Sequence, residues 1–104
     1  MDSILDATHY QSLSAVRTHI DELDREIVEL LAHRWRLSMI AIRFKVHEPH
    51  FQDDERRREV LEERDDWGIA AGLPRQVMKR LYNYLIDQVE DEQARIRSAS
   101  LDEG

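Results

Sequence analysis

The sequence predicts an all-α protein of three helices, the first of them very long. The composition favours this, because 36% of the 104 residues are charged, 7% are aromatic, and there are only three Gly and two Pro. Such a composition is typical of long helices joined by few turns. Apolar residues also recur every three or four positions from Leu13 to Phe44, which is the period of an amphipathic helix. The length allows one domain at most.

The first helix is expected to begin at Ser12 or Ser14, since either hydroxyl can cap a helix N-terminus. Nothing interrupts the apolar pattern before Pro49, and a proline disfavours helical backbone in the residue before it. The helix is then roughly 50 Å long. Two shorter helices of the same chain cannot cover so long a stripe. The sequence therefore predicts an intertwined homodimer, in which part of the first helix packs on the partner.

The second helix is expected to begin after Asp53 or Asp54, with its apolar side at Val60, Leu61, Trp67, Ile69 and Ala70. Gly72 ends it, because a glycine readily adopts the left-handed conformation that follows a helix.

The third helix is expected from about Pro74, near its first turn, to Arg97. The domain then covers residues 13–97. Residues 1–12 and the polar tail 98–104 are expected to be flexible.

Two cations on the first helix are the strongest functional signal. Arg34 and Lys45 differ by about 20° around the helix axis and lie roughly 16 Å apart, with the small side chains of Ser38 and Ala41 between them. This spacing fits a small dianion. Arg17 lies about 100° off that face and is expected to serve the pocket of the other subunit. The alternative is that these cations are solvated surface residues.

On the third helix, Ile86, Val89, Glu90 and Gln93 share one face. A glutamine in an apolar stripe can donate to and accept from a ligand; alternatively, it bonds a neighbouring helix or water. Glu90 is expected either at the rim of a pocket or as the partner of a pocket cation, since an unpaired buried carboxylate is costly.

Several functional classes are disfavoured. A net charge of −7 argues against non-specific nucleic-acid binding. The chain has no Cys, which excludes disulfides and thiolate chemistry. It has no positively charged, apolar N-terminal segment and no apolar run long enough to cross a membrane, so a cytoplasmic protein is expected. His47 and His50, with Asp53, straddle a proline loop, and no metal site is expected there.

The second helix opens with a dense cluster of charged residues, 53–58. The cluster is either a solvated helix start with local ion pairs or a lid, of which one or two residues lean over the first helix.

These patterns together resemble the all-α chorismate mutase family. The resemblance covers about residues 13–97 and rests on Val16-Arg17, Ile20-Asp21, Leu23-Asp24, Leu30-Leu31-Ala32, Arg34, Lys45, Asp53, Arg56 and Gln93. It implies an intertwined helical dimer with two equivalent sites and no cofactor. It also implies the rearrangement of chorismate to prephenate, a step of aromatic amino acid biosynthesis.

The resemblance assigns a role to each matching residue. Arg17 of the partner subunit and Arg34 would each bind a substrate carboxylate, and Lys45 and Gln93 would bracket the ether oxygen. The residues expected to contact the substrate are Arg17, Arg34, Ala41, Lys45, Asp53, Arg56, Arg57, Ile86, Val89, Glu90 and Gln93. Among these, Asp53 would orient the ring hydroxyl, Arg56 would close the site, and Ala41 and Ile86 would form apolar wall.

Two residues depart from the family pattern. Arg57 stands where a Glu often bonds the ring hydroxyl, and Glu90 stands where the family often has an apolar wall residue. The two could pair with one another, or they could mark a different ring substituent.

Three alternatives stay open. The isochorismate pyruvate lyases, a sister group that produces salicylate and pyruvate, are similar at Arg43-Phe44-Lys45, at Glu55-Arg56 and at Glu92-Gln93. A third relative rearranges 4-amino-4-deoxychorismate, whose amine Arg57 would repel and Glu90 would attract. A dimeric coiled-coil interaction module is the non-enzyme alternative, although such modules prefer Leu or Ile at interior positions.

Overall fold

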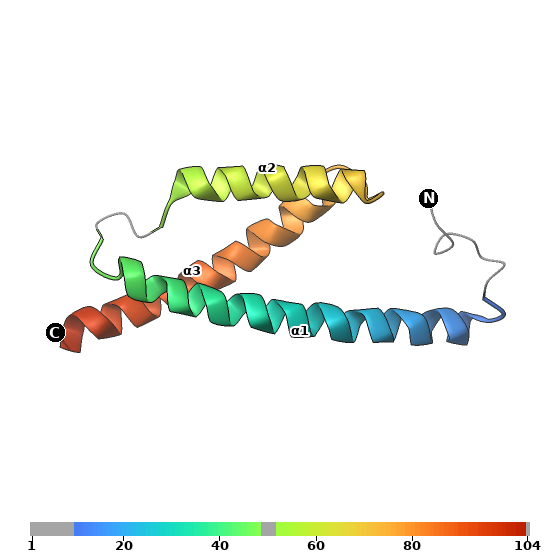
Figure 1. Cartoon of the computed structure of the whole chain (residues 1–104), viewed down its shortest axis with the longest axis horizontal. Helices are drawn as coiled ribbons and strands as arrows, with labels where there is room; N and C mark the ends of the chain where they lie inside the picture. The colour runs from blue at the N-terminus through green and yellow to red at the C-terminus, as the bar shows by residue number, and fades with distance from the viewer. Residues whose placement is uncertain (1–9, 49–51, 104) are drawn as a thin grey trace. The chain divides into compact units, whose positions relative to one another are not determined.

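The computed structural model describes residues 10–48 and 52–103 and contains three helices (Figure 1). They are α1 (Leu13–Lys45), α2 (Asp54–Ala70) and α3 (Val77–Glu103), and no strand occurs among the described residues. The all-α fold with a very long first helix is therefore confirmed. The chain divides into two compact units, Met1–Trp35 and Arg36–Gly104, which are described separately below.

Both predicted helix starts are built by local caps. The Ser12 hydroxyl oxygen accepts from the backbone N–H of Ala15 at 3.0 Å, and α1 then runs for 33 residues. Asp53 is the N-cap of α2, and its Oδ1 accepts from the backbone N–H of Arg56 at 3.0 Å. Each side chain satisfies a donor that the first turn of a helix leaves unpaired.

The end of α2 is a Schellman turn. The N–H of Leu73 donates to the Gly68 carbonyl at 2.9 Å, and the N–H of Gly72 donates to the Ile69 carbonyl at 3.0 Å. Gly72 has a φ of 102°, a conformation that costs glycine little because it has no Cβ. The predicted stop at Gly72 is confirmed.

The predicted bounds of the third helix are wrong at both ends. The helix begins at Val77 rather than near Pro74, because Gln76 has a φ of 79° and cannot be helical. Asp65, only 7% exposed, accepts from the backbone N–H of Gln76 at 2.8 Å and holds this turn. At its other end the helix continues to Glu103 instead of ending near Arg97. Most of the segment expected to be flexible at 1–12 lies outside the described residues.

The second unit has a small core to which all three helices contribute: Ile42 of α1, Val60 of α2, and Ile86 and Val89 of α3 are buried. The apolar side predicted for α2 is only partly right. Val60 is buried, but Trp67 is 58% exposed, and Asp65 and Gly68 take the other buried positions. Gly68 is needed where α2 meets α3, because a Cβ there would lie 2.5 Å from Cγ of Met78.

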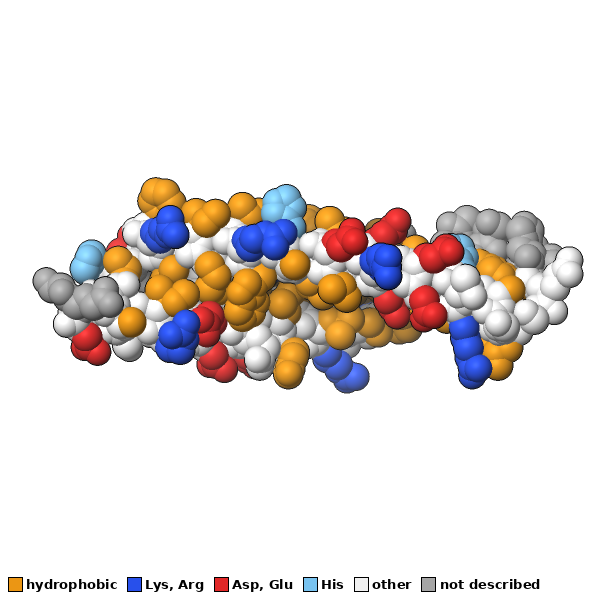
Figure 2. Space-filling model, turned by 90° about the horizontal axis from the view of Figure 1, so that it is seen from below, with side chains coloured by type: hydrophobic (Ala, Val, Ile, Leu, Met, Phe, Trp, Pro, Cys, Tyr) orange, Lys and Arg blue, Asp and Glu red, His pale blue; other side chains and the backbone are white. Residues whose placement is uncertain are grey.

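Much of the apolar stripe of α1 is uncovered in the single chain. Figure 2 shows hydrophobic side chains at the surface, interspersed with charged ones. Five stripe residues in the first unit are between 40% and 67% exposed, namely Ile20, Leu23, Ile27, Leu30 and Leu31. Monomeric proteins rarely expose so much contiguous apolar surface.

Candidate active site

The predicted cations lie on α1. Arg17 is exposed and Arg34 is half-buried, both in the first unit. Lys45 is the last residue of α1 and is half-buried in the second unit, where Ala41 is exposed.

Gln93 brings α3 against the predicted face of α1. Its side chain is among the most buried in the described part of the chain, with 4% of the residue exposed. Its Nε2 donates to the backbone carbonyl of Ser38 at 2.8 Å. Ser38 is one of the small residues between Arg34 and Lys45, so the amide reaches the segment that the cation spacing singled out. This bond is also the contact with a neighbouring helix that was one of the two alternatives.

Arg57 is held by a cluster of acceptors on α3. Its Nη1 donates to Oε1 of Glu90 at 2.6 Å, and its Nη2 donates to Oδ1 of Asp87 at 2.6 Å and to Oδ1 of Asn83 at 2.8 Å. The Nη2 group also donates to the Asn83 carbonyl at 3.1 Å. The structure therefore shows Arg57 and Glu90 paired with one another, which was one of the two alternatives for these residues.

The charge of Arg57 is stabilised by this cluster. Burial, which leaves 19% of the side chain exposed, disfavours the charged form. The hydrogen bond and charge of Asp87, with those of Glu90, outweigh burial and raise the pKa of Arg57 above its ordinary value. Arg57 is a cation at any pH at which the protein would be assayed.

The structure separates Arg57 from its neighbours at the start of α2. Arg56 and Asp53 are exposed, and the Asp53 carboxylate serves as the helix cap. Because successive helical residues point about 100° apart, only Arg57 reaches α3. On α3, Ile86 and Val89 are buried and Glu90 is half-buried, so the four residues predicted to share a face do lie on the packed side of this helix.

Sequence reasoning missed the contacts that Arg97 makes. Its Nε donates to the Val46 carbonyl at 2.8 Å, and its Nη2 donates to the Glu48 carbonyl at 3.1 Å. Its position four residues after Gln93 was the available signal, since residues i and i+4 share a helix face. The acceptors, however, are backbone atoms, which no sequence pattern marks.

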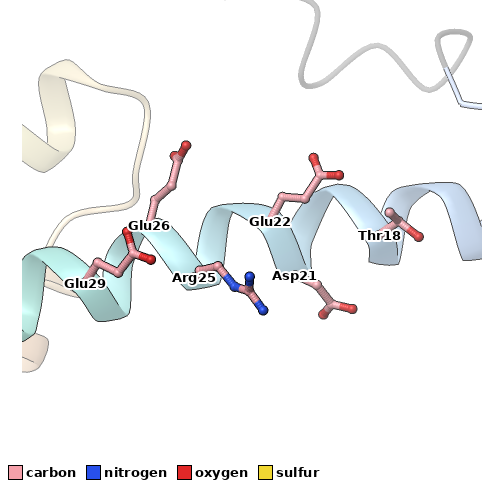
Figure 3. Close-up of a pocket in the computed structure, with 6 residues that line it drawn as sticks. All are labelled: Thr18, Asp21, Glu22, Arg25, Glu26 and Glu29. Atoms are coloured by element: carbon pink, nitrogen blue, oxygen red, sulfur yellow. The ribbon is translucent and has the colours of Figure 1, made fainter.

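A hollow on the first unit has the wrong charge for an anionic ligand. It measures about 350 Å³ and is lined by Thr18, Asp21, Glu22, Arg25, Glu26 and Glu29, all of them on α1 (Figure 3). The lining carries four carboxylates and a single guanidinium, and every lining residue is exposed. The hollow is the solvated polar face of the helix.

A second hollow of about 240 Å³ lies where α2 turns into α3, between Arg64, Trp67, Gly68, Ala71, Leu73, Met78 and Tyr82. The Arg64 guanidinium carbon is 4.5 Å from the Trp67 ring centroid and 5.8 Å from that of Tyr82, which is within the range of cation–π attraction. Sequence reasoning had placed Trp67 on the apolar side of the second helix but had predicted no site here.

Two searches of the described residues gave negative results. No group of three or more His, Asp or Glu is placed to hold a metal ion in the described part of the chain; His50, which belonged to the weak histidine pattern, falls outside it. No helix within residues 10–48 and 52–103 combines the length and apolarity needed to cross a membrane.

The described residues define a class of protein, an all-helical one in which a buried amide of α3 bonds the backbone of α1. The profile of one family, described as chorismate mutase type II, matches residues 16–94, which is more than half of the chain. The chain therefore belongs to the chorismate mutase type II family. Comparisons with curated proteins and with solved structures gave no significant match.

Proposed function

We propose that the protein is a chorismate mutase that rearranges chorismate to prephenate. One observation carries the proposal beyond family membership. The Gln93 side-chain amide donates to the backbone carbonyl of Ser38. Ser38 lies between Arg34 and Lys45 in the sequence. A buried neutral donor on this segment of α1 would suit an anionic substrate whose reaction needs no acid, base or nucleophile.

The reaction places two requirements on this chain. The substrate must be held in its compact conformer, so that the C–C bond can form while the ether C–O bond breaks in the same molecule. Arg34, and Arg17 of the partner subunit, would do this by binding one carboxylate each, which is a positioning effect.

Negative charge that develops on the ether oxygen must also be stabilised. Lys45 and Gln93 would donate to that oxygen, and fixed donors of this kind lower the barrier without reorganising. The Gln93 amide nitrogen carries two hydrogens, so one can serve Ser38 while the other serves the substrate.

A homodimer is part of the proposal. The exposed stripe on residues 20–31 of α1 supports it, because the second copy of the chain carries a stripe of the same length and pattern. Each site would then combine Arg34, Lys45 and Gln93 of one subunit with Arg17 of the other.

The Arg57–Glu90 ion pair bears on the choice of substrate. A free carboxylate at Glu90 would attract the amine of 4-amino-4-deoxychorismate. Here that carboxylate is bonded at 2.6 Å to Arg57, which also pairs with Asp87, so Glu90 is already engaged and the pair favours a substrate with an uncharged ring substituent. Both chorismate and isochorismate satisfy this condition, and the lyase reaction on isochorismate is the second candidate.

The test is a parallel assay of the purified protein with chorismate, isochorismate and 4-amino-4-deoxychorismate, with prephenate, salicylate, pyruvate and the rearranged amine all quantified. We expect prephenate from chorismate without release of pyruvate. Efficient formation of salicylate and pyruvate from isochorismate would replace the mutase assignment with the lyase. Turnover of none of the three would support the interaction-module alternative.

A further inference from the structure

Arg97 donates hydrogen bonds to the backbone immediately after α1. Its two hydrogen bonds, of 2.8 Å to the Val46 carbonyl and 3.1 Å to the Glu48 carbonyl, reach the residues that follow Lys45. The side chain is half-buried, and it comes from the C-terminal half of α3, 51 residues along the chain from Val46.

The end of a helix is where a cation of this shape is most useful. The last carbonyls of a helix have no partner within it and carry the negative end of the helix dipole. A guanidinium offers several donors in a rigid plane and can bond two carbonyls at once, which a lysine cannot do in the same geometry. Arg97 thus bonds two carbonyls of the turn that follows Lys45, the last residue of α1, and does so from another helix.

The Arg97 contact is the second of two that α3 makes with the backbone of this segment. Gln93, one turn earlier on the same face of α3, donates to the Ser38 carbonyl. Gln93 and Arg97 thus bind the backbone on either side of Lys45. A further bond, from the Glu48 N–H to the Lys45 carbonyl at 3.2 Å, links the Arg97-bound segment directly to Lys45.

We propose that Arg97 is a positioning residue that fixes the last turn of α1 and thereby the Lys45 ammonium. Without these bonds the turn after Lys45 would loosen, the bond from the Glu48 N–H to the Lys45 carbonyl would be lost, and the last turn of α1 would fray. Lys45 would then sample positions away from its productive one. The kinetic part of this proposal rests on the proposed function, while the backbone part does not.

The experiment compares Arg97→Ala with Arg95→Ala. Arg95 is on the same helix, and its side chain is 70% exposed and pairs with Glu92 of α3. Its removal therefore makes the same change in charge without removing a bond to the segment after α1. Amide hydrogen exchange is followed at Lys45 and Glu48, and kcat and KM are measured with chorismate. Both are repeated with millimolar guanidinium, well below denaturing concentrations.

We expect Arg97→Ala to accelerate exchange at Lys45 and Glu48 by roughly tenfold or more. We also expect it to lower kcat by about ten- to a hundredfold while KM changes little, as for a misplaced group that acts mainly in the transition state. Added guanidinium should restore part of both losses, and Arg95→Ala should show neither.

Each contrary result has its own meaning. Unchanged exchange in Arg97→Ala would overturn the proposal, whatever the activity. Faster exchange with unchanged kcat would show that Arg97 holds this backbone without positioning Lys45, and would also overturn it. If the unmodified protein does not turn over chorismate, the proposed function fails. The exchange and its rescue by guanidinium are measured without substrate, so they still decide whether Arg97 fixes the backbone at Lys45.

Discussion

Lys45 is the residue on which the proposed chemistry depends most. We predict that Lys45→Ala lowers kcat by about 10²- to 10³-fold, the usual loss when one donor to a developing oxyanion is removed. Lys79→Ala is the matched control, because Lys79, near the start of α3, pairs with Glu62 of α2 and not with any proposed site residue. Steady-state kinetics and circular dichroism of both variants would check the prediction, and near-normal turnover of a folded Lys45→Ala protein would contradict it.

The Arg57–Glu90 pair should contribute to stability as well as to selectivity. We predict a coupling free energy of about 1 kcal/mol between Arg57→Ala and Glu90→Gln in a double-mutant cycle, because the pair is shielded from solvent and hydrogen-bonded. Guanidinium unfolding at one fixed protein concentration measures it. The exposed Arg95–Glu92 pair is the control and should show no measurable coupling. Additive effects at Arg57 and Glu90 would contradict the prediction.

The sequence predicted the contacts of some residues better than those of others. The pairing of Arg57 with Glu90 could be anticipated as one alternative, because both lay at positions where the family pattern was broken. The sequence could not show that Arg57 rather than Arg56 reaches α3, since that depends on the exact rotation of α2. The contacts of Arg97 could not be anticipated either, because they end on backbone carbonyls.

At the level of elements, the sequence predicted those helix ends that are fixed by residues close by in the chain. Ser12, Asp53 and Gly72 each act within a few residues of their own position, so sequence alone suffices. The start of α3 was mispredicted because it depends on Asp65, which reaches the Gln76 N–H from another helix.

The close approach of α2 and α3 gives a prediction for Gly68. We predict that Gly68→Ala destabilises the protein by about 1–3 kcal/mol, because overpacking against Met78 outweighs the roughly 1 kcal/mol that Ala gains over Gly in a helix. Denaturant unfolding measures the change. In the Gly68→Ala, Met78→Ala double variant the loss should be smaller than the sum of the two single losses. A stabilised Gly68→Ala protein would show that the helices are not in close contact here.

At the scale of the whole molecule, the exposed stripe of α1 predicts a homodimer in solution. Sedimentation equilibrium at micromolar concentration should give twice the chain mass of 12.4 kDa. Ile27→Lys, in the stripe, should weaken the dimer by at least tenfold in Kd, since it would bury an unpaired charge. Glu26→Lys, on the polar face next to it, should not. A monomeric mass for the unmodified protein would remove the basis for a shared site.

The most direct test of the account is complementation between two inactive variants. Arg17→Ala and Arg34→Ala should each be inactive as homodimers. Mixed in equal amounts and allowed to exchange subunits, they should recover roughly a quarter of the activity of the unmodified protein, because half of the dimers are mixed and each mixed dimer has one intact site. Recovery of prephenate formation at that level would support a chorismate mutase whose sites are shared between chains. No recovery, with mixed dimers confirmed by mass, would contradict it.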